Sequence, residues 1–132
     1  MSNSSKDMNQ NIVNENLTQE QKKVLFEKAT EPPFSGKYLD YKGEGKFVCA
    51  NCHSKLFDSS TKFESGSGWP SFYDAIDKDA IHTQTDKSHF MVRTEILCAN
   101  CGGHLGHLFR DGPNPTGLRY CVNSLSVEID TE

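Results

Sequence analysis

Cysteine is the residue type in this chain with the clearest capacity for chemistry. Four of the five cysteines form two C-x-x-C pairs, at positions 49 and 52 and at positions 98 and 101, and Cys121 stands alone. Two such pairs supply the four thiolates that suit tetrahedral zinc. The sequence therefore predicts a metal site made by Cys49, Cys52, Cys98 and Cys101, and it leaves Cys121 as a candidate nucleophile.

Other readings of the two pairs remain open. Four thiolates also suit iron, as in a rubredoxin-like site. The first pair continues into His53, which matches the C-x-x-C-H pattern of haem attachment. Haem would leave the second pair without a purpose, so zinc is favoured.

Cys121 has a cation nearby in the sequence. Arg119 is two residues away, and a neighbouring cation favours the reactive thiolate form of a cysteine. The alternative is a structural cysteine, because a free thiol also packs well as a small hydrophobic group. The local sequence alone does not decide between these roles.

Two histidines and a tryptophan accompany the cysteines. His104 and His107 follow the second pair closely, and they are available for proton transfer if four thiolates already fill the metal shell. Asp111 is a candidate to orient one of them. If fewer thiolates bound the metal, the histidines could instead be ligands in a zinc hydrolase. Trp69, in a glycine-rich turn, is either a core residue or an apolar wall for a small substrate group.

Length and charge narrow the class of protein. A chain of 132 residues is long enough for one domain with a core, and the net charge of -4 argues against nucleic-acid binding. No apolar run is long enough to span a membrane, and the start does not resemble a signal peptide. We expect a soluble cytoplasmic protein without membrane or nucleic-acid partners, in which paired cysteines bind metal and do not form disulfides.

Turn signals and alternation predict a mainly antiparallel β fold with one leading helix. Residues 1–16 are polar and are predicted to form a disordered tail, and residues 17–132 to form the domain. Thr18 and Gln21 fit a capping box ahead of a helix that ends before Pro32. Short strands are expected at residues 46–49, 88–97, 108–109, 119–122 and 125–130.

Several motifs together resemble the B-type peptide methionine sulfoxide reductases. They are the two cysteine pairs, G-S-G-W-P-S-F at 66–72, C-G-G-H-L-G-H at 101–107, D-G-P at 111–113 and R-Y-C-V-N-S at 119–124. The resemblance covers residues 17–129 and implies a curled, barrel-like antiparallel sheet with one structural zinc. It also implies reduction of the R epimer of methionine sulfoxide in oxidised proteins or peptides.

The resemblance assigns roles to individual residues. Cys121 corresponds to the nucleophile and Trp69 to the residue that packs the substrate methyl group. His107 and His104 correspond to the polar side of the pocket. Asp111, Arg119 and Asn123 would set protonation and position. The competing hypothesis is a zinc-binding interaction module without catalysis.

One position departs from a common family pattern. Many relatives carry a second, resolving cysteine where this chain has Ser67. The sulfenic acid that the first step leaves on Cys121 must then be reduced by an external thiol, with thioredoxin, glutaredoxin or glutathione as candidates. We expect a monomer.

Overall fold

The computed structural model describes residues 12–131, apart from the side chain of His89. Most of the predicted disordered tail, residues 1–11, lies outside the described residues. At the start of the described residues, Val13 and Asn14 donate backbone hydrogen bonds to Asn51 Oδ1 at 2.7 and 3.1 Å. The boundary at residue 17 stays a prediction.

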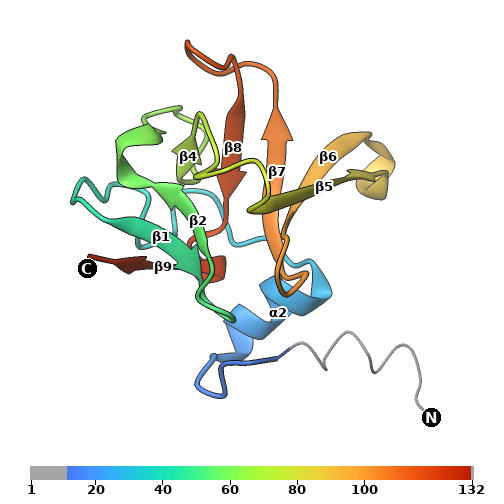
Figure 1. Cartoon of the computed structure of the whole chain (residues 1–132). Coiled ribbons are helices and arrows are strands. Elements are labelled where there is room, and N and C mark those ends of the chain that lie inside the picture. The colour runs from blue at the N-terminus through green and yellow to red at the C-terminus, as the bar shows by residue number, and fades with distance from the viewer. Residues whose placement is uncertain (1–11, 132) are drawn as a thin grey trace.

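Antiparallel strands form two sheets (Figure 1). The smaller sheet has the order β2-β1-β9, with β1 at Lys46–Cys49, β2 at Lys55–Asp58 and β9 at Val127–Asp130. The larger sheet has the order β3-β4-β8-β7-β6-β5. Its strands are Lys62–Phe63, Ser71–Phe72, Ile81–Asp86, Arg93–Cys98, His104–Phe109 and Arg119–Val122, numbered β3 to β8 along the chain.

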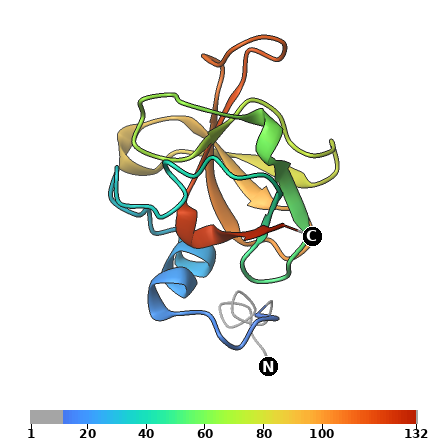
Figure 2. The ribbon, with the colours of Figure 1, turned by 90° about the vertical axis from the view of Figure 1, so that its left-hand side faces the viewer.

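The mainly β, antiparallel class with one leading helix is confirmed, and the expected barrel-like sheet is not closed into a barrel. Among the described residues, β3 and β5 are the outer strands of the larger sheet and do not pair with each other. A barrel needs its first and last strands to share hydrogen bonds. The fold is therefore two open sheets. The loop between β7 and β8 projects at the end opposite the helix (Figure 2).

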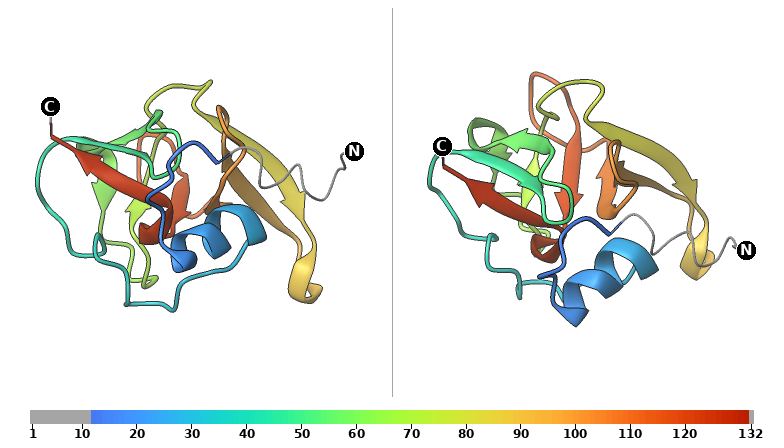
Figure 3. Two further views of the ribbon diagram at one scale, coloured as in Figure 1. Left: turned by 90° about the horizontal axis from the view of Figure 1, so that it is seen from below. Right: turned by 60° about the horizontal axis from the view of Figure 1, so that its bottom comes forward.

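The helix α2 at Gln19–Glu27 begins as the sequence predicts. The Thr18 side chain accepts a hydrogen bond from the Gln21 amide, and the Gln21 side chain accepts one from the Thr18 amide. The helix stops at Lys28, which takes the left-handed conformation. Its buried face packs against β7, with the end of the Leu25 side chain close to Gly103 just before that strand, and the helix crosses one end of the molecule (Figure 3). No helix in the described part of the chain is long and apolar enough to cross a membrane.

Aromatic side chains join the two sheets in the core. Phe57 of β2 stacks on Phe72 of β4 with ring centroids 4.4 Å apart, and Phe47 of β1 meets the same ring edge-on at 5.0 Å. All three rings are completely buried. Each such pair adds about 1 kcal/mol beyond the burial of its area, so these contacts help to fix how the sheets meet.

The predicted strand at 88–97 begins too early. Residues Ser88–Phe90 form a 3-10 turn and β6 starts at Arg93, while Phe90 and Val92 are exposed on the tip of the β5–β6 hairpin. Their apolar alternation matched a strand pattern, but the chain must turn there so that Asp86 can pair with Arg93. The preceding strand β5 was not predicted. The last strand is also shorter than predicted, because Ser124–Ser126 form another 3-10 turn before β9.

Candidate functional site

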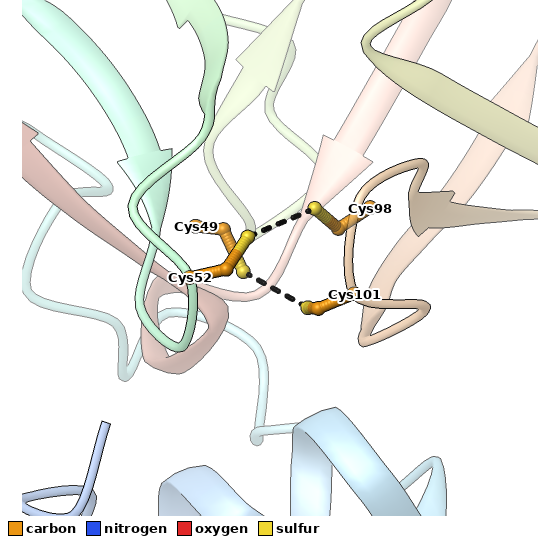
Figure 4. Close-up of side chains that lie close together, drawn as sticks. All are labelled: Cys49, Cys52, Cys98 and Cys101. Carbon is orange, nitrogen blue, oxygen red and sulfur yellow. Dashed lines mark hydrogen bonds between the residues drawn. The ribbon is translucent and has the colours of Figure 1, made fainter. Parts of the chain in front are cut away.

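The four paired cysteines meet in one cluster, as predicted (Figure 4). We call Cys49, Cys52, Cys98 and Cys101 the thiol cluster. Their sulfur atoms all lie within 4.8 Å of one another, with Cys49–Cys101 at 3.7 Å and Cys52–Cys98 at 3.5 Å. In a tetrahedral site with zinc–sulfur bonds of about 2.3 Å, neighbouring sulfur atoms are separated by nearly the 3.5 and 3.7 Å found here. The donor set and its spacing therefore fit zinc, and all four positions are filled by protein.

The thiol cluster favours a cation on electrostatic grounds. The pKa of Cys101 is lowered to about 2 because its sulfur accepts hydrogen bonds from Cys49 and Cys98. The hydrogen bond with Cys101 raises the pKa of Cys98 to about 12, and the same kind of bond raises that of Cys49 further. One thiolate thus opposes ionisation of its neighbours, and a divalent cation removes that conflict.

Cys121 lies on β8, between β4 and β7. It is opposite Ser71 on one side and opposite His107 on the other, and only 8% of it is exposed. The close approach of β7 requires glycine at position 106, where a Cβ atom would lie 1.9 Å from the Cys121 carbonyl oxygen. Strand pairing therefore brings the free thiol beside a histidine that precedes it by 14 residues.

A small cavity of about 70 Å³ opens at this thiol, and we call it the cysteine cavity. The structure brings four of the predicted site residues to it: Cys121, His107, Trp69 and Asn123. The other lining residues are Thr30, Arg93, Gly106 and Phe109. The lining contains both aromatic and polar side chains, which suits a small group that has both an apolar and a polar end.

Arg119 connects Cys121 to Asp111. Its guanidinium donates to the Cys121 sulfur at 3.6 Å and to both carboxylate oxygens of Asp111 at 2.7 and 3.1 Å. The hydrogen bond from Arg119 lowers the pKa of Asp111, and the pair raises the pKa of Arg119. Asp111 itself is 65% exposed and does not line the cavity. Its place is behind the arginine, where it holds the cation against the thiol.

The two histidines have partners other than the predicted Asp111. His107 Nε2 lies 2.8 Å from Asp86 Oδ2, and His104 Nδ1 lies 2.7 Å from Glu95 Oε2. The expectation that Asp111 orients a histidine is therefore wrong, because that carboxylate is taken by Arg119. His104 does not line the cavity but packs edge-on against His107, with ring centroids 5.5 Å apart. Both rings are buried.

Asn123 and Trp69 are held by a shared backbone partner. The Asn123 side-chain oxygen accepts from the Glu31 amide at 3.0 Å, and its side-chain amide donates to the Leu105 carbonyl oxygen at 3.1 Å. The Trp69 indole donates to the Glu31 carbonyl oxygen at 3.0 Å. Both side chains are fixed before any substrate arrives, which is what a preorganised pocket requires.

Ser67 lies beside the free thiol. Its hydroxyl is 3.5 Å from the Cys121 sulfur, and it also contacts Ser65 at 2.9 Å. Position 67 is therefore within reach of whatever forms on Cys121. Among the residues that the structure describes, all five cysteines are unpaired, and four of them face one another in the thiol cluster.

Sequence reasoning missed the two carboxylates that hold the histidines. Asp86 ends a strand that was not predicted, so nothing placed it near His107. Glu95 lies between Thr94 and Ile96 in the predicted strand, on the face opposite the apolar alternation, so the pattern gave no reason to expect its burial. A buried charge there needs partners, and Gln84 and His104 supply them.

A buried thiol beside a cation, an aromatic wall and a carboxylate-bound histidine defines a thiol-dependent enzyme. A SelR domain model matches residues 17–131. The peptide methionine sulfoxide reductase MsrB of Methanosarcina barkeri is 55% identical over 116 residues, which are 88% of this chain and 82% of that protein. The protein of the same name from Leptospira interrogans is 54% identical and is covered to 88%. The chain therefore belongs to the B-type peptide methionine sulfoxide reductase family.

Proposed function

We propose that this enzyme reduces the R epimer of methionine sulfoxide in oxidised proteins or peptides, with Cys121 as the nucleophile. Family membership makes it a peptide methionine sulfoxide reductase. The observation that carries the residue assignment is the cysteine cavity, where a thiol, an aromatic wall and a buried histidine converge. The non-catalytic zinc module is not favoured, because such a module needs none of these groups.

The walls of the cysteine cavity suit the two ends of a methyl sulfoxide. The Trp69 ring offers an apolar surface for the methyl group, while His107 and Asn123 offer polar groups for the oxygen. A sulfoxide sulfur carries a methyl group, an oxygen and the rest of the side chain. When methyl and oxygen are held on different walls, only one epimer can direct its remaining chain out to solvent.

The first step is an exchange of oxygen between two sulfur atoms. The Cys121 sulfur attacks the sulfoxide sulfur, the sulfur–oxygen bond breaks, and the oxygen leaves on Cys121 as a sulfenic acid. The sulfoxide gains two electrons and becomes methionine, while the cysteine sulfur loses two. The thiol proton and the oxygen are both retained in the sulfenic acid, so the step balances without another reactant. The guanidinium of Arg119 stabilises the attacking thiolate.

His107 is the proposed proton donor to the sulfoxide oxygen, and His104 supports it. His107 lines the cavity and is opposite Cys121 in the strand register, whereas His104 lies behind it. An oxygen on sulfur is a poor leaving group unless it is protonated, so an acid near the oxygen lowers the barrier. Asp86 keeps the His107 ring oriented through its hydrogen bond.

An external thiol regenerates the enzyme in this proposal. Two thiols reduce the sulfenic acid to a thiol and release water and a disulfide. Ser67 occupies the position beside Cys121 from which a cysteine could do this internally. Because the thiol cluster is committed elsewhere, thioredoxin, glutaredoxin or glutathione must supply the electrons.

We also propose one structural zinc per chain, held by the thiol cluster. Cys49 ends β1 of the smaller sheet and Cys98 ends β6 of the larger one, so the ion would cross-link the two sheets. Four thiolates leave no coordination position for a substrate, and the ion takes no part in the oxygen transfer. Free thiols in such number fit the reducing cytoplasm. The monomeric state stays a prediction.

Single-turnover assays test the proposal directly. The zinc-loaded protein is mixed with a blocked peptide that contains either R- or S-methionine sulfoxide, without any reductant. We expect about one equivalent of methionine from the R epimer only, and none with Cys121→Ser. Mass spectrometry should find the added oxygen on Cys121. Consumption of the S epimer, or turnover by the serine variant, would refute the assignment.

A further inference from the structure

Glu95 is a buried carboxylate placed one hydrogen bond behind the histidine pair. Its side chain has no exposed surface. It accepts hydrogen bonds from Gln84 Nε2 at 2.9 Å and from Lys28 Nζ at 3.1 Å, and its second oxygen lies 2.7 Å from His104 Nδ1. Burial raises the pKa of Glu95, but these three partners lower it more, so the group is ionised at neutral pH.

A buried charge of this kind is costly for the fold. Removing a carboxylate from water costs several kcal/mol before its partners are counted, and an apolar residue would fill the same volume without that cost. Three partners from three different elements meet this one carboxylate: the end of α2, β5 and β7. The arrangement therefore points to a role for the charge itself.

The hydrogen bond to Glu95 determines the state of His104. An ionised carboxylate only accepts, so His104 carries its proton on Nδ1 and leaves Nε2 as an acceptor. That Nε2 is buried and has no hydrogen-bond partner among the described residues. The ring is thus fixed in one tautomer, with its neighbour His107 against it.

We propose that Glu95 is a positioning residue for sulfoxide reduction, whose buried carboxylate holds the His104 ring in one tautomer and in place against His107. The inference rests on the proposed function, because the pair is taken as the source of the proton for the sulfoxide oxygen. Glu95 does not line the cysteine cavity and acts only through His104.

The neighbouring charges predict in which direction the pKa of His104 should move in each variant. The pKa of His104 is lowered overall: burial lowers it most, the hydrogen bond to Glu95 and its charge raise it, and the charges of His107 and Lys28 lower it. His107 is flanked by Asp86, which is itself paired with Arg93, and by Cys121 on the next strand. Removing the Glu95 charge should therefore make His104 harder to protonate, and removing the Lys28 charge should make it easier.

Two variants of the zinc-loaded protein test these opposite signs. Glu95→Gln keeps the shape and an acceptor oxygen but loses the charge, while Lys28→Gln loses the opposite charge from a side chain that is 57% exposed. Ring signals of His104 are followed by NMR across pH, and methionine formation from the R epimer is measured in single turnovers at each pH.

For Glu95→Gln we expect the His104 titration, and the alkaline fall of the single-turnover rate, to move to lower pH by about one unit. The rate at neutral pH should fall about tenfold. Lys28→Gln should move the His104 titration and the alkaline fall of the rate to higher pH, by a smaller amount, because solvent screens an exposed charge. If Glu95→Gln does not fold, the Lys28→Gln shift still decides.

A merely structural role predicts a different pattern. In that case the single-turnover rate of each variant would fall by the same factor at every pH, and the His104 titration would not move. That result would overturn the proposal. Failure of the reductase assignment is a separate outcome. In that case the unmodified protein forms no methionine at any pH, whereas the ring titrations still report whether Glu95 controls the histidine.

Discussion

The thiol cluster and the cysteine cavity are both built around cysteine, but they are assembled in opposite ways. Each half of the cluster comes from one tight turn at the end of one strand, at Cys49–Cys52 and at Cys98–Cys101. The cavity is lined from several separate segments. His107 in its wall and His104 behind it are held by carboxylates of two further strand positions, Asp86 and Glu95. The thiol cluster links the two sheets, whereas the cysteine cavity exists only once the whole fold is formed.

The largest expected effect separates stability from chemistry. Cys98→Ser removes one ligand of the proposed zinc, and since structural zinc contributes on the order of 10 kcal/mol in small domains, the variant should lose both the ion and cooperative unfolding. Cys121→Ser should keep zinc content and melting temperature while losing all sulfoxide reduction. Metal analysis and thermal unfolding of both variants check this. If Cys98→Ser unfolded normally, the cluster would not be what holds the sheets together.

The histidine pair is expected to show the next largest effect. His107→Ala should slow single-turnover reduction of the R epimer by about 10²–10⁴-fold, because the sulfoxide oxygen loses its proton donor. His104→Ala should have a smaller effect, since that ring does not reach the cavity. Rates are compared at equal zinc content. The reverse order of the two effects would mean that His104, and not His107, delivers the proton.

Trp69 tests whether the aromatic wall selects the substrate. Trp69→Ala should reduce kcat/KM for the R epimer by about 10- to 100-fold, because a methyl-sized apolar contact is worth only a few kcal/mol. The preference for R over S should shrink with it. Trp69→Phe keeps the apolar surface but loses the indole bond to Glu31, and it serves as the matched variant. An unchanged epimer ratio in Trp69→Ala would place the methyl group elsewhere.

Asp86 should show the smallest effect and the clearest dependence on pH. The hydrogen bond from His107 holds the pKa of Asp86 well below its usual value. A carboxyl group with a depressed folded-state pKa stabilises the fold above its unfolded pKa of about 4, and that contribution is lost as pH falls through the folded pKa. Because solvent partly screens this pair, Asp86→Asn should thus cost only about 1 kcal/mol at pH 7, and progressively less below pH 4. Urea unfolding at several pH values measures the difference, and a gap that does not narrow in acid would assign it to packing.

The same contrast explains what the sequence could predict. The capping box at Thr18 and strands such as β1 and β8 depend on residues close together in the chain, and the structure confirms them. The thiol cluster joins distant segments, but each C-x-x-C pair is a local motif whose chemistry calls for a second pair, and the structure brings the two together. Asp86 and Glu95 reach the histidines only through the β5–β6–β7 pairing. That pairing was hidden because the exposed Phe90 and Val92 at the hairpin tip imitate a buried strand. The barrel-like form of the sheet came only from the family resemblance, and whether such a sheet closes depends on pairing between distant strands.

The position of β8 has a consequence for the order in which the protein is made. This strand lies between β4 and β7, yet it follows both in the chain, and β9 follows it to join β1. A ribosome therefore delivers all four cluster cysteines, the tryptophan and both histidines before it delivers Cys121. Until then β3–β4 and β5–β6–β7 are separate hairpin assemblies with no strand between them. The thiol cluster can therefore form before Cys121 exists, and the last strands to emerge complete both sheets and the cysteine cavity.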